Sequence, residues 1–475
     1  MLSRNLSRAP FADRRRRSST ASLVQHSVSN SIIVIRANNR SIGLSLSNTI
    51  PFSSKIPVQI LSLAFRLFCP ALLATVVFGQ SRETVSRSVT LIDLAPPVSS
   101  SSGQPFLQVT PENRLLLSWM EPGKSRRHAL RFAISSGNTW EHPETVIEGD
   151  DFFVNWADVP SVVQLANGTF AAHWLKKNGK GTYAYDVRLR MRRKGSGAWS
   201  TEIAPHRDGT QTEHGFVSLI DGPPGGVEAL WLDGRGMAGK GGHDGHGEGG
   251  SMALRSAVVS FEGSLKEETE LDPRVCECCP TAVARTETGI IVAYRDRSET
   301  EVRDIFVVRK ENGRWREPER VHEDGWQIPG CPVNGPALSA VGKNVAIAWF
   351  TAAGGEAKVL VAFSQDNGAS FGKPFRVDDG KPLGRVDLAM LPDGSALVSW
   401  IEWHEEMSEL VVRHLGPGGS KETGTTITPI SAERASGYPR MVLLGGDAFF
   451  AWTDVEGAKT VRVGKVPIHA LIRAQ

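Results

Sequence analysis

After its first 80 residues, the sequence lacks both long apolar runs and an excess of basic charge. Runs of more than about nine apolar residues are scarce there, so amphipathic helices have little support. Glycine and proline are plentiful instead, with 48 and 27 residues. The composition therefore predicts a chain with numerous turns rather than a bundle of helices.

The basic balance of the whole chain belongs to its beginning. Residues 1–80 contain ten of the 54 Lys and Arg residues and one of the 51 acidic residues, Asp13. The remainder has 44 basic and 50 acidic side chains, a net charge of −6. A nucleic-acid partner would require a basic surface, so none is expected.

The first 80 residues have the pattern of a targeting segment. Residues 1–56 form a basic, Ser-rich extension, which is either disordered or the product of a mis-assigned start. Residues 57–80 are typical of a secretory signal: Arg66 precedes a short apolar run over 67–77, and small residues follow. The run is shorter than the roughly 20 apolar residues of a transmembrane helix. We therefore expect an exported protein, periplasmic or secreted, with no integral membrane segment in the mature chain.

Only four cysteines would remain after removal of this signal: Cys276, Cys278, Cys279 and Cys331. An even number of cysteines in an exported chain favours two disulfides. Because adjacent cysteines do not easily pair, Cys278 or Cys279 should bridge to Cys276 or Cys331. Thiolates at this spacing could instead bind zinc or copper(I).

A repeat of about 55 residues dominates the rest of the chain. Each unit has a short strand, a turn with Gly or Asn, and a second strand that ends in an aromatic residue. The aromatic residues are Trp119, Trp174, Trp231, Tyr294, Trp349, Trp400 and Trp452, at intervals of 55, 57, 63, 55, 51 and 52 residues. A third alternating strand and a fourth strand follow in the complete units. Four antiparallel strands joined by tight turns make one blade of a β-propeller.

The repeat predicts an all-β fold, a single β-propeller of four-stranded blades over residues 85–475. Seven units can be counted, and six blades remain the alternative. The seventh unit ends after its third strand, at residues 460–466. Residues 88–94 have the alternation of a strand and are expected to supply the missing one, closing the ring between the two termini.

One hairpin resembles a known family. Residues 364–371, SQDNGASF, match the Asp-box S-x-D-x-G-x-[ST]-[WF] of the sialidase-like propellers, through Ser364, Asp366, Gly368 and Phe371. The Asp carboxylate accepts hydrogen bonds of the turn, and Gly adopts a positive φ. The Asp-box is structural and occurs in proteins other than sialidases. Two features depart from sialidases: seven units instead of six, and no F/Y-R-I-P arginine motif.

A propeller gathers distant segments at one mouth of its channel. The segments before each first strand and after each second strand share a face, and most of the unusual polar residues fall there. A sialidase-like mechanism would need arginines to clamp a carboxylate, a Tyr nucleophile with a Glu partner, and an acid/base Asp. The candidates for these roles are Arg295, Arg385 and Arg440 for the clamp, Tyr438 with Glu213, Asp158 or Asp296 for the acid/base, and His214 and Asn334 as further substrate contacts.

Two functions from different classes follow from this resemblance. The first is an exo-glycosidase that hydrolyses sialic-acid-like or other acidic glycans. The second is a non-catalytic propeller that binds a glycan or a protein, since one fold hosts many functions. Neither requires a cofactor or a metal, although His243 and His246 in a Gly-rich loop could bind one. We expect a monomer whose partner is a glycan or another acidic extracellular ligand.

Overall fold

The computed structural model describes residues 87–472, except residues 126, 240–249, 405 and 420–423. These residues belong to one compact unit of the chain, residues 80–475. The segments predicted as extension and signal, 1–56 and 57–80, lie outside the described residues. The loop with His243 and His246 does so as well.

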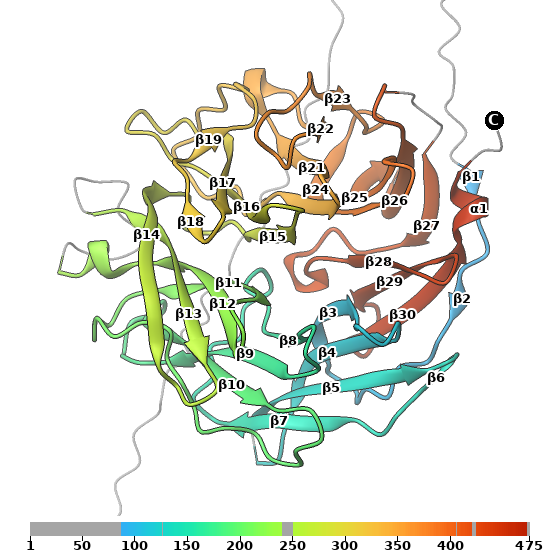
Figure 1. The fold of residues 1–475 in the computed structure, drawn as a ribbon. Coiled ribbons are helices and arrows are strands. Elements are labelled where there is room, and N and C mark those ends of the chain that lie inside the picture. The colour runs from blue at the N-terminus through green and yellow to red at the C-terminus, as the bar shows by residue number, and fades with distance from the viewer. Residues whose placement is uncertain (1–86, 126, 240–249, 405, 420–423, 473–475) are drawn as a thin grey trace, which may run out of the picture. The chain divides into compact units, whose positions relative to one another are not determined.

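The described chain folds into seven antiparallel sheets that follow one another around a centre (Figure 1). The first contains β3 (Gly103–Val109), β4 (Leu115–Pro122), β5 (His128–Ser136), β6 (Thr139–Trp140) and β7 (Glu144–Gly149). The second contains β8 (Ser161–Gln164), β9 (Phe170–Lys177) and β10 (Tyr185–Arg192), and its fourth strand is reduced to one bridge, Leu189 with Ile203. The third contains β11 (His214–Asp221), β12 (Gly226–Asp233), β13 (Met252–Ser260) and β14 (Leu265–Val275).

The remaining four sheets repeat this order. The fourth contains β15 (Ala282–Arg285), β16 (Gly289–Arg295), β17 (Ile305–Glu311), β18 (Arg314–Trp315) and β19 (Glu319–Arg320). The fifth contains β20 (Ala337–Val341), β21 (Asn344–Thr351), β22 (Lys358–Ser364) and β23 (Phe375–Arg376). The sixth contains β24 (Pro382–Met390), β25 (Ala396–His404), β26 (Met407–Leu415) and β27 (Thr425–Pro429). The seventh contains β28 (Arg440–Leu444), β29 (Asp447–Asp454) and β30 (Thr460–Pro467). The prediction of an all-β propeller is confirmed, with seven blades rather than six.

The N-terminal strand closes the ring, as predicted. β2 (Ile92–Asp93) pairs antiparallel with β30, so it becomes the outer strand of the seventh blade. The structure adds a second contact, because β1 (Arg87–Ser88) pairs in parallel with β27 of the sixth blade. β28 and β29 then lie against β3 of the first blade. The two ends of the propeller are thus joined by hydrogen bonds and by packing.

The repeated aromatic residue at the end of each second strand anchors its blade. Trp119, Trp231 and Trp400 are completely buried, and each indole N–H donates to a carboxylate two residues later in the same strand. Such a side chain buries a large apolar area while its one polar atom keeps a partner. The repeat that predicted the fold therefore also accounts for its packing.

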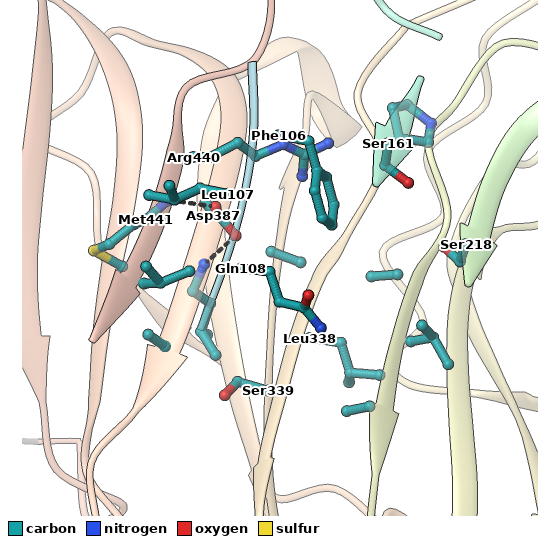
Figure 2. A pocket seen from close by; sticks show the side chains of 18 of the residues that line it. Phe106, Leu107, Gln108, Ser161, Ser218, Leu338, Ser339, Asp387, Arg440 and Met441 are labelled. Atoms are coloured by element: carbon teal, nitrogen blue, oxygen red, sulfur yellow. Dashed lines mark hydrogen bonds between the residues drawn. The ribbon is translucent and has the colours of Figure 1, made fainter. Parts of the chain in front are cut away.

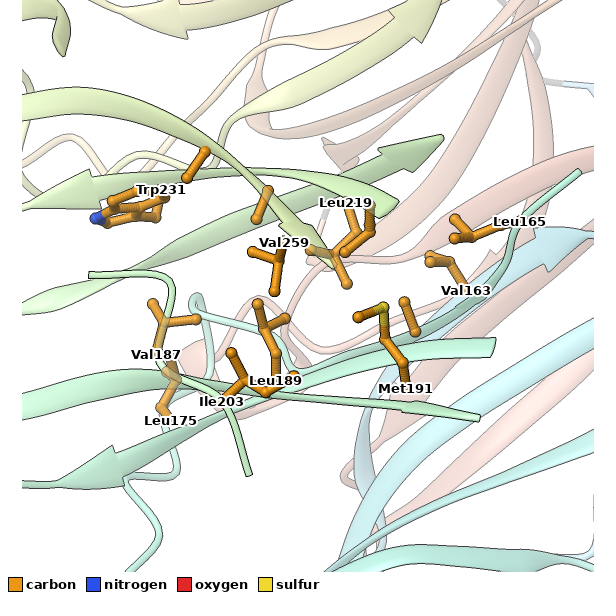
Figure 3. Packing of buried hydrophobic residues seen from close by; sticks show 14 of the residues in the cluster. Val163, Leu165, Leu175, Val187, Leu189, Met191, Ile203, Leu219, Trp231 and Val259 are labelled. Atoms are coloured by element: carbon orange, nitrogen blue, oxygen red, sulfur yellow. The ribbon is translucent and has the colours of Figure 1, made fainter. Parts of the chain in front are cut away.

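The core lies between neighbouring blades, where alternate strand residues interdigitate. Figure 3 shows one such layer, in which Val187, Leu189 and Met191 of β10 face Leu219 and Trp231 of the third blade. Period-2 alternation places these residues on one face of each sheet. Packing of sheet faces against each other is what orients the seven blades around the channel.

The described residues contain little helix. The single α-helix, α1 (Ile468–Leu471), has four residues, and three short 3₁₀ turns lie at Arg235–Met237, Ala353–Gly355 and Arg434–Ser436. None of the described helices has the length and hydropathy needed to cross a membrane.

Candidate functional site

The innermost strands of all seven blades line a central cavity of about 530 Å³. Its walls consist mainly of aliphatic side chains and hydroxyls. They come from the short first strands, in which alternate residues point toward the centre. Figure 2 shows Arg440 and Phe106 close together at one end, with Ser161 and Ser218 on the opposite wall. The volume is in the range of cavities that bind small ligands.

Arg440 is the one sequence-predicted arginine that lines this cavity. Its guanidinium lies over the ring of Phe106, 5.6 Å from the centroid. Its Nε–H is buried and has no hydrogen-bond acceptor among the described residues. An opposite charge that interacts with Arg440 is Asp387, whose two oxygens accept the backbone N–H groups of Met441 at 2.8 Å and Leu388 at 2.9 Å. Burial raises the pKa of Asp387, and the charge of Arg440 opposes that rise.

Tyr438 lines the same cavity but is not arranged as a nucleophile. Its phenol O–H donates to the backbone carbonyl of Val333, and its ring stacks on Trp156 at a centroid distance of 6.0 Å. Burial raises the pKa of Tyr438 far above its ordinary value. A tyrosine with a committed proton and no adjacent base is not activated for attack.

The other two predicted clamp arginines support the backbone instead of facing a ligand. Arg295 is 1% exposed and donates to the carbonyl oxygens of Asn334, Arg303 and Phe350. Arg385 donates to the Ser436 hydroxyl and to the carbonyl oxygens of three residues between 432 and 437.

Asn334 joins the two arginines into one cluster. Its side-chain oxygen accepts the backbone N–H of Arg385 at 2.8 Å, while its carbonyl accepts the guanidinium of Arg295. The structure therefore brings Asn334, Arg295 and Arg385 together, but as a brace between blades and not along the cavity wall.

Glu213 and Asp158 meet at Tyr185. The hydroxyl of Tyr185 lies 2.6 Å from Glu213 Oε1 and 3.1 Å from Asp158 Oδ2. Burial, and to a smaller extent the charge of Glu213, raise the pKa of Asp158 to about 8, although a hydrogen bond from the Phe216 N–H opposes this rise. All three side chains are buried away from the cavity, so Glu213 is the partner of Tyr185 and not of Tyr438.

His214 belongs to a buried polar cluster at the start of β11. Its ring stacks on His206 at 3.9 Å, and its Nε2 lies 3.3 Å from Asp208 and 3.7 Å from Asp233. Burial opposes protonation, yet the hydrogen bond to Asp208 and the nearby carboxylates raise the pKa of His214. Arg235 binds Asp233 at 2.7 Å, which adds a positive charge beside these carboxylates.

Asp296 lies apart from the cavity as well. Burial and the charge of Asp272 raise the pKa of Asp296 to about 7. Tyr294, two residues earlier, donates its phenol proton to Asp272 at 2.6 Å. Asp296 therefore lies beside a Tyr–Asp pair that joins β16 of the fourth blade to β14 of the third.

The predicted disulfides are not formed: all four cysteines are free thiols. The closest pair, the Sγ atoms of Cys276 and Cys279, is 3.0 Å apart, whereas a disulfide bond measures about 2.05 Å. Cys276, Cys278 and Cys279 nevertheless gather their sulfur atoms within 4.8 Å of one another. Cys331 is exposed, and its sulfur atom is not one of this group. The cysteine spacing predicted correctly that these thiols lie close together. Three of them converge, and no disulfide joins any two.

The hairpin of residues 364–371 has the local geometry of an Asp-box. Asp366 accepts hydrogen bonds from the Ser364 hydroxyl and from the N–H and hydroxyl of Ser370. Gly368 has a φ of +80°, and Phe371 packs in the core between the fourth and fifth blades.

The sequence matches no protein-family model and no curated protein. Several solved structures are similar in fold at low identity. The polysaccharide lyase Uly1 has a TM-score of 0.46 and 10% identity, with 81% of this chain and 92% of that chain covered. A protein of unknown function from Dyadobacter fermentans has a TM-score of 0.45 and 14% identity, with 80% and 98% covered. A variant of the NanB sialidase from Streptococcus pneumoniae has a TM-score of 0.43 and 13% identity, with 80% and 71% covered.

The likeness concerns the fold, and the activities named for these neighbours are their own. The site of this propeller has to be argued from its own side chains.

Two groups in and around the site were missed by the sequence analysis. Phe106 and Ser161 line the cavity because each belongs to the inward-facing alternate residues of its first strand. This period-2 pattern could have predicted them once the first strands were assigned. Tyr185 and Asp208 could not have been found this way, because their partners come from other strands and loops.

Proposed function

We propose that this protein is a non-catalytic propeller that binds an acidic ligand, such as a glycan ending in a uronic or sialic acid, in its central cavity. The observation that carries this proposal is Arg440, whose buried Nε–H has no acceptor among the described residues. A carboxylate is the natural acceptor for such a donor, because guanidinium and carboxylate match in geometry as well as in charge.

The charge of the cavity wall favours an anion. Its charged lining residues are Arg440, Arg285 and Asp387, two basic and one acidic. Both oxygens of Asp387 already accept backbone N–H groups, and burial raises its pKa. The ring of Phe106 orients the guanidinium and offers an apolar face to a sugar ring.

Hydrolysis has less support than binding. The arginines expected to form a carboxylate clamp are bonded to backbone carbonyls, and the phenol of Tyr438 is committed to Val333. Glu213 and Asp158 are buried around Tyr185, outside the cavity. No described group in the cavity combines a free nucleophile with a nearby base, the arrangement that covalent catalysis requires.

Calorimetric titration of the full-length protein with glucuronate-terminated and N-acetylneuraminate-terminated oligosaccharides tests the proposal. Arg440→Gln should weaken binding about 10- to 100-fold, since a charge-assisted hydrogen bond contributes about 1.5–3 kcal/mol. Arg462→Gln is the control, because Arg462 is half-exposed and pairs with Asp93 far from the cavity wall.

Two results would contradict the proposal. One is equal affinity for the acidic oligosaccharides and for neutral analogues in which the carboxylate is reduced to an alcohol. The other is turnover of fluorogenic sialosides or uronides by the wild type, which would support the exo-glycosidase hypothesis instead.

The proposal also covers where in or outside the cell the protein acts. The basic residue and short apolar run before residue 80 support export, so the ligand would be extracellular or periplasmic. We further propose that the protein acts as a monomer, which gel filtration with light scattering would check.

A further inference from the structure

The thiol cluster is a group of metal-binding atoms that the proposed ligand site does not use. Cys276 and Cys279 are the first and last residues of a tight turn that follows β14, which brings their side chains together. Their sulfur atoms are 3.0 Å apart, and Cys278 Sγ lies 3.9 Å from Cys276 Sγ.

The surrounding backbone holds this turn in place. The N–H of Cys276 donates to the carbonyl of Arg295 at 3.0 Å, which ties the turn to β16. Pro280 follows the last cysteine, and Gly335 approaches it so closely that a Cβ there would lie 2.0 Å from the Pro280 carbonyl oxygen. The thiols are therefore presented by a clamped segment rather than by a free loop.

The charges around the cluster suit an anionic centre. Arg303 donates to Cys276 Sγ at 3.3 Å and also binds Glu277 and Glu301 at 2.8 Å. Arg297 shares the same two carboxylates, while buried Arg295 is bonded to backbone carbonyls. Three guanidiniums thus face two carboxylates, and the surplus positive charge can stabilise thiolates in a site with little access to water.

From this geometry we propose that Cys276, Cys278 and Cys279 bind one copper(I) ion as a three-coordinate thiolate centre. Soft thiolates select Cu(I), whereas structural zinc sites almost always have four ligands. With metal–sulfur bonds of about 2.3 Å, a trigonal centre needs sulfur atoms about 4.0 Å apart. The Cys276–Cys278 distance already fits, and the Cys276–Cys279 distance must open by about 1 Å.

Binding involves no oxidation or reduction. Cu(I) replaces the three thiol protons, which leave to solvent, and the centre carries a charge of −2 that the guanidiniums partly offset. Cys331 is exposed and its sulfur atom does not belong to the group within 4.8 Å, so it is not assigned as a ligand of the bound ion.

Competition with bicinchoninate under anaerobic, reducing conditions measures the binding of Cu(I) to the full-length protein. The wild type should take up one ion per chain, and X-ray absorption should show three sulfur neighbours. Cys276→Ser and Cys279→Ser should each weaken binding at least about 100-fold, while Cys331→Ser should keep the wild-type stoichiometry and an affinity within about threefold. Arg303→Gln should weaken binding about 10- to 100-fold, as losses of supporting contacts around metals do.

Thermal unfolding separates loss of the site from loss of the fold. Cu(I) should raise the melting temperature of the wild type and of Cys331→Ser, and leave that of folded Cys276→Ser unchanged. The proposal is overturned if the protein retains no copper against the competitor, or if Cys276→Ser binds as the wild type does. It is also overturned if the isolated protein holds zinc through four sulfurs including Cys331, or contains a Cys276–Cys279 disulfide that blocks uptake after mild reduction.

Discussion

At the scale of single residues, burial favours the protonated form of one carboxyl, that of Asp158. The one phenol proton of Tyr185 faces two carboxyl groups, and it can satisfy only Glu213 or Asp158. Protonated Asp158 can donate to the phenol oxygen while its other oxygen accepts the Phe216 N–H at 2.8 Å. This arrangement agrees with the pKa of Asp158, which burial raises to about 8. The neutral acid is therefore the form that the folded protein stabilises.

This protonation makes stability depend on pH. Because the pKa of Asp158 is higher in the folded than in the unfolded chain, its contribution is fully present below pH about 4 and is lost as the pH rises toward 8. Asp158→Asn keeps both hydrogen bonds without a titrating group. In the wild type, this contribution to the free energy of unfolding should fall as the pH rises from 5 to 8. We expect Asp158→Asn to make the fall shallower by up to about 1.4 kcal/mol per pH unit.

Urea unfolding at several pH values checks this expectation. Asp93→Asn is the control, since Asp93 is exposed, and its profile should follow the wild type. A profile of Asp158→Asn that also parallels the wild type would show that Asp158 is ionised in the folded protein.

At the scale of elements, the Asp-box hairpin is held by its own turn and by the neighbouring blade. A Cβ on Gly368 would lie 2.2 Å from Ile291 Cδ1 in β16, and its φ of +80° disfavours any side chain. Gly368→Ala should therefore lower the free energy of unfolding by about 2–4 kcal/mol, from backbone strain and overpacking together.

Gly372 in the same hairpin provides a matched comparison. Its backbone does not need a positive φ, and a Cβ there would meet the Phe363 carbonyl oxygen at 3.7 Å, an ordinary contact. Gly372→Ala should change stability by less than about 0.5 kcal/mol in guanidinium unfolding. Equal effects of the two substitutions would mean that the hairpin does not pack against the fourth blade as described.

At the scale of the whole molecule, stability depends on closure of the ring. Leu94 follows the closing strand β2, donates its N–H to the Val463 carbonyl at 2.9 Å, and packs with Leu107 and Phe449 between the first and seventh blades. Leu94→Ala should lower the free energy of unfolding by about 2–5 kcal/mol, the range for a buried leucine. The loss should be measured on the full chain by chemical denaturation.

The neighbouring Asp93→Ala tests whether the effect comes from closure or from the segment in general. Asp93 pairs with Arg462 at 2.7 Å, but both side chains are about half-exposed, so the pair contributes about 1 kcal/mol or less. A Leu94→Ala loss no larger than that of Asp93→Ala would argue that the closing strand does not contribute to the core.

The sequence by itself determined the blades and how they close. Strand alternation and a recurring terminal aromatic residue act within about 55 residues, so local periodicity was enough to predict seven units, and the missing strand of the last unit pointed to the N-terminus. The proximity of Cys276, Cys278 and Cys279 could also be predicted locally, because one turn is enough to bring the three side chains together.

Only the tertiary structure decided what each polar residue of the predicted mouth does. Arg295, Arg385 and Arg440 were all predicted at the same mouth, yet two of them bind backbone carbonyls remote in sequence and one lines the cavity. A charged side chain pairs with whichever group the fold places beside it, and that group is set by the twist and packing of neighbouring blades. Periodicity carries no information about such partners, so it could place Glu213 and Asp158 at one end of the propeller but not around Tyr185.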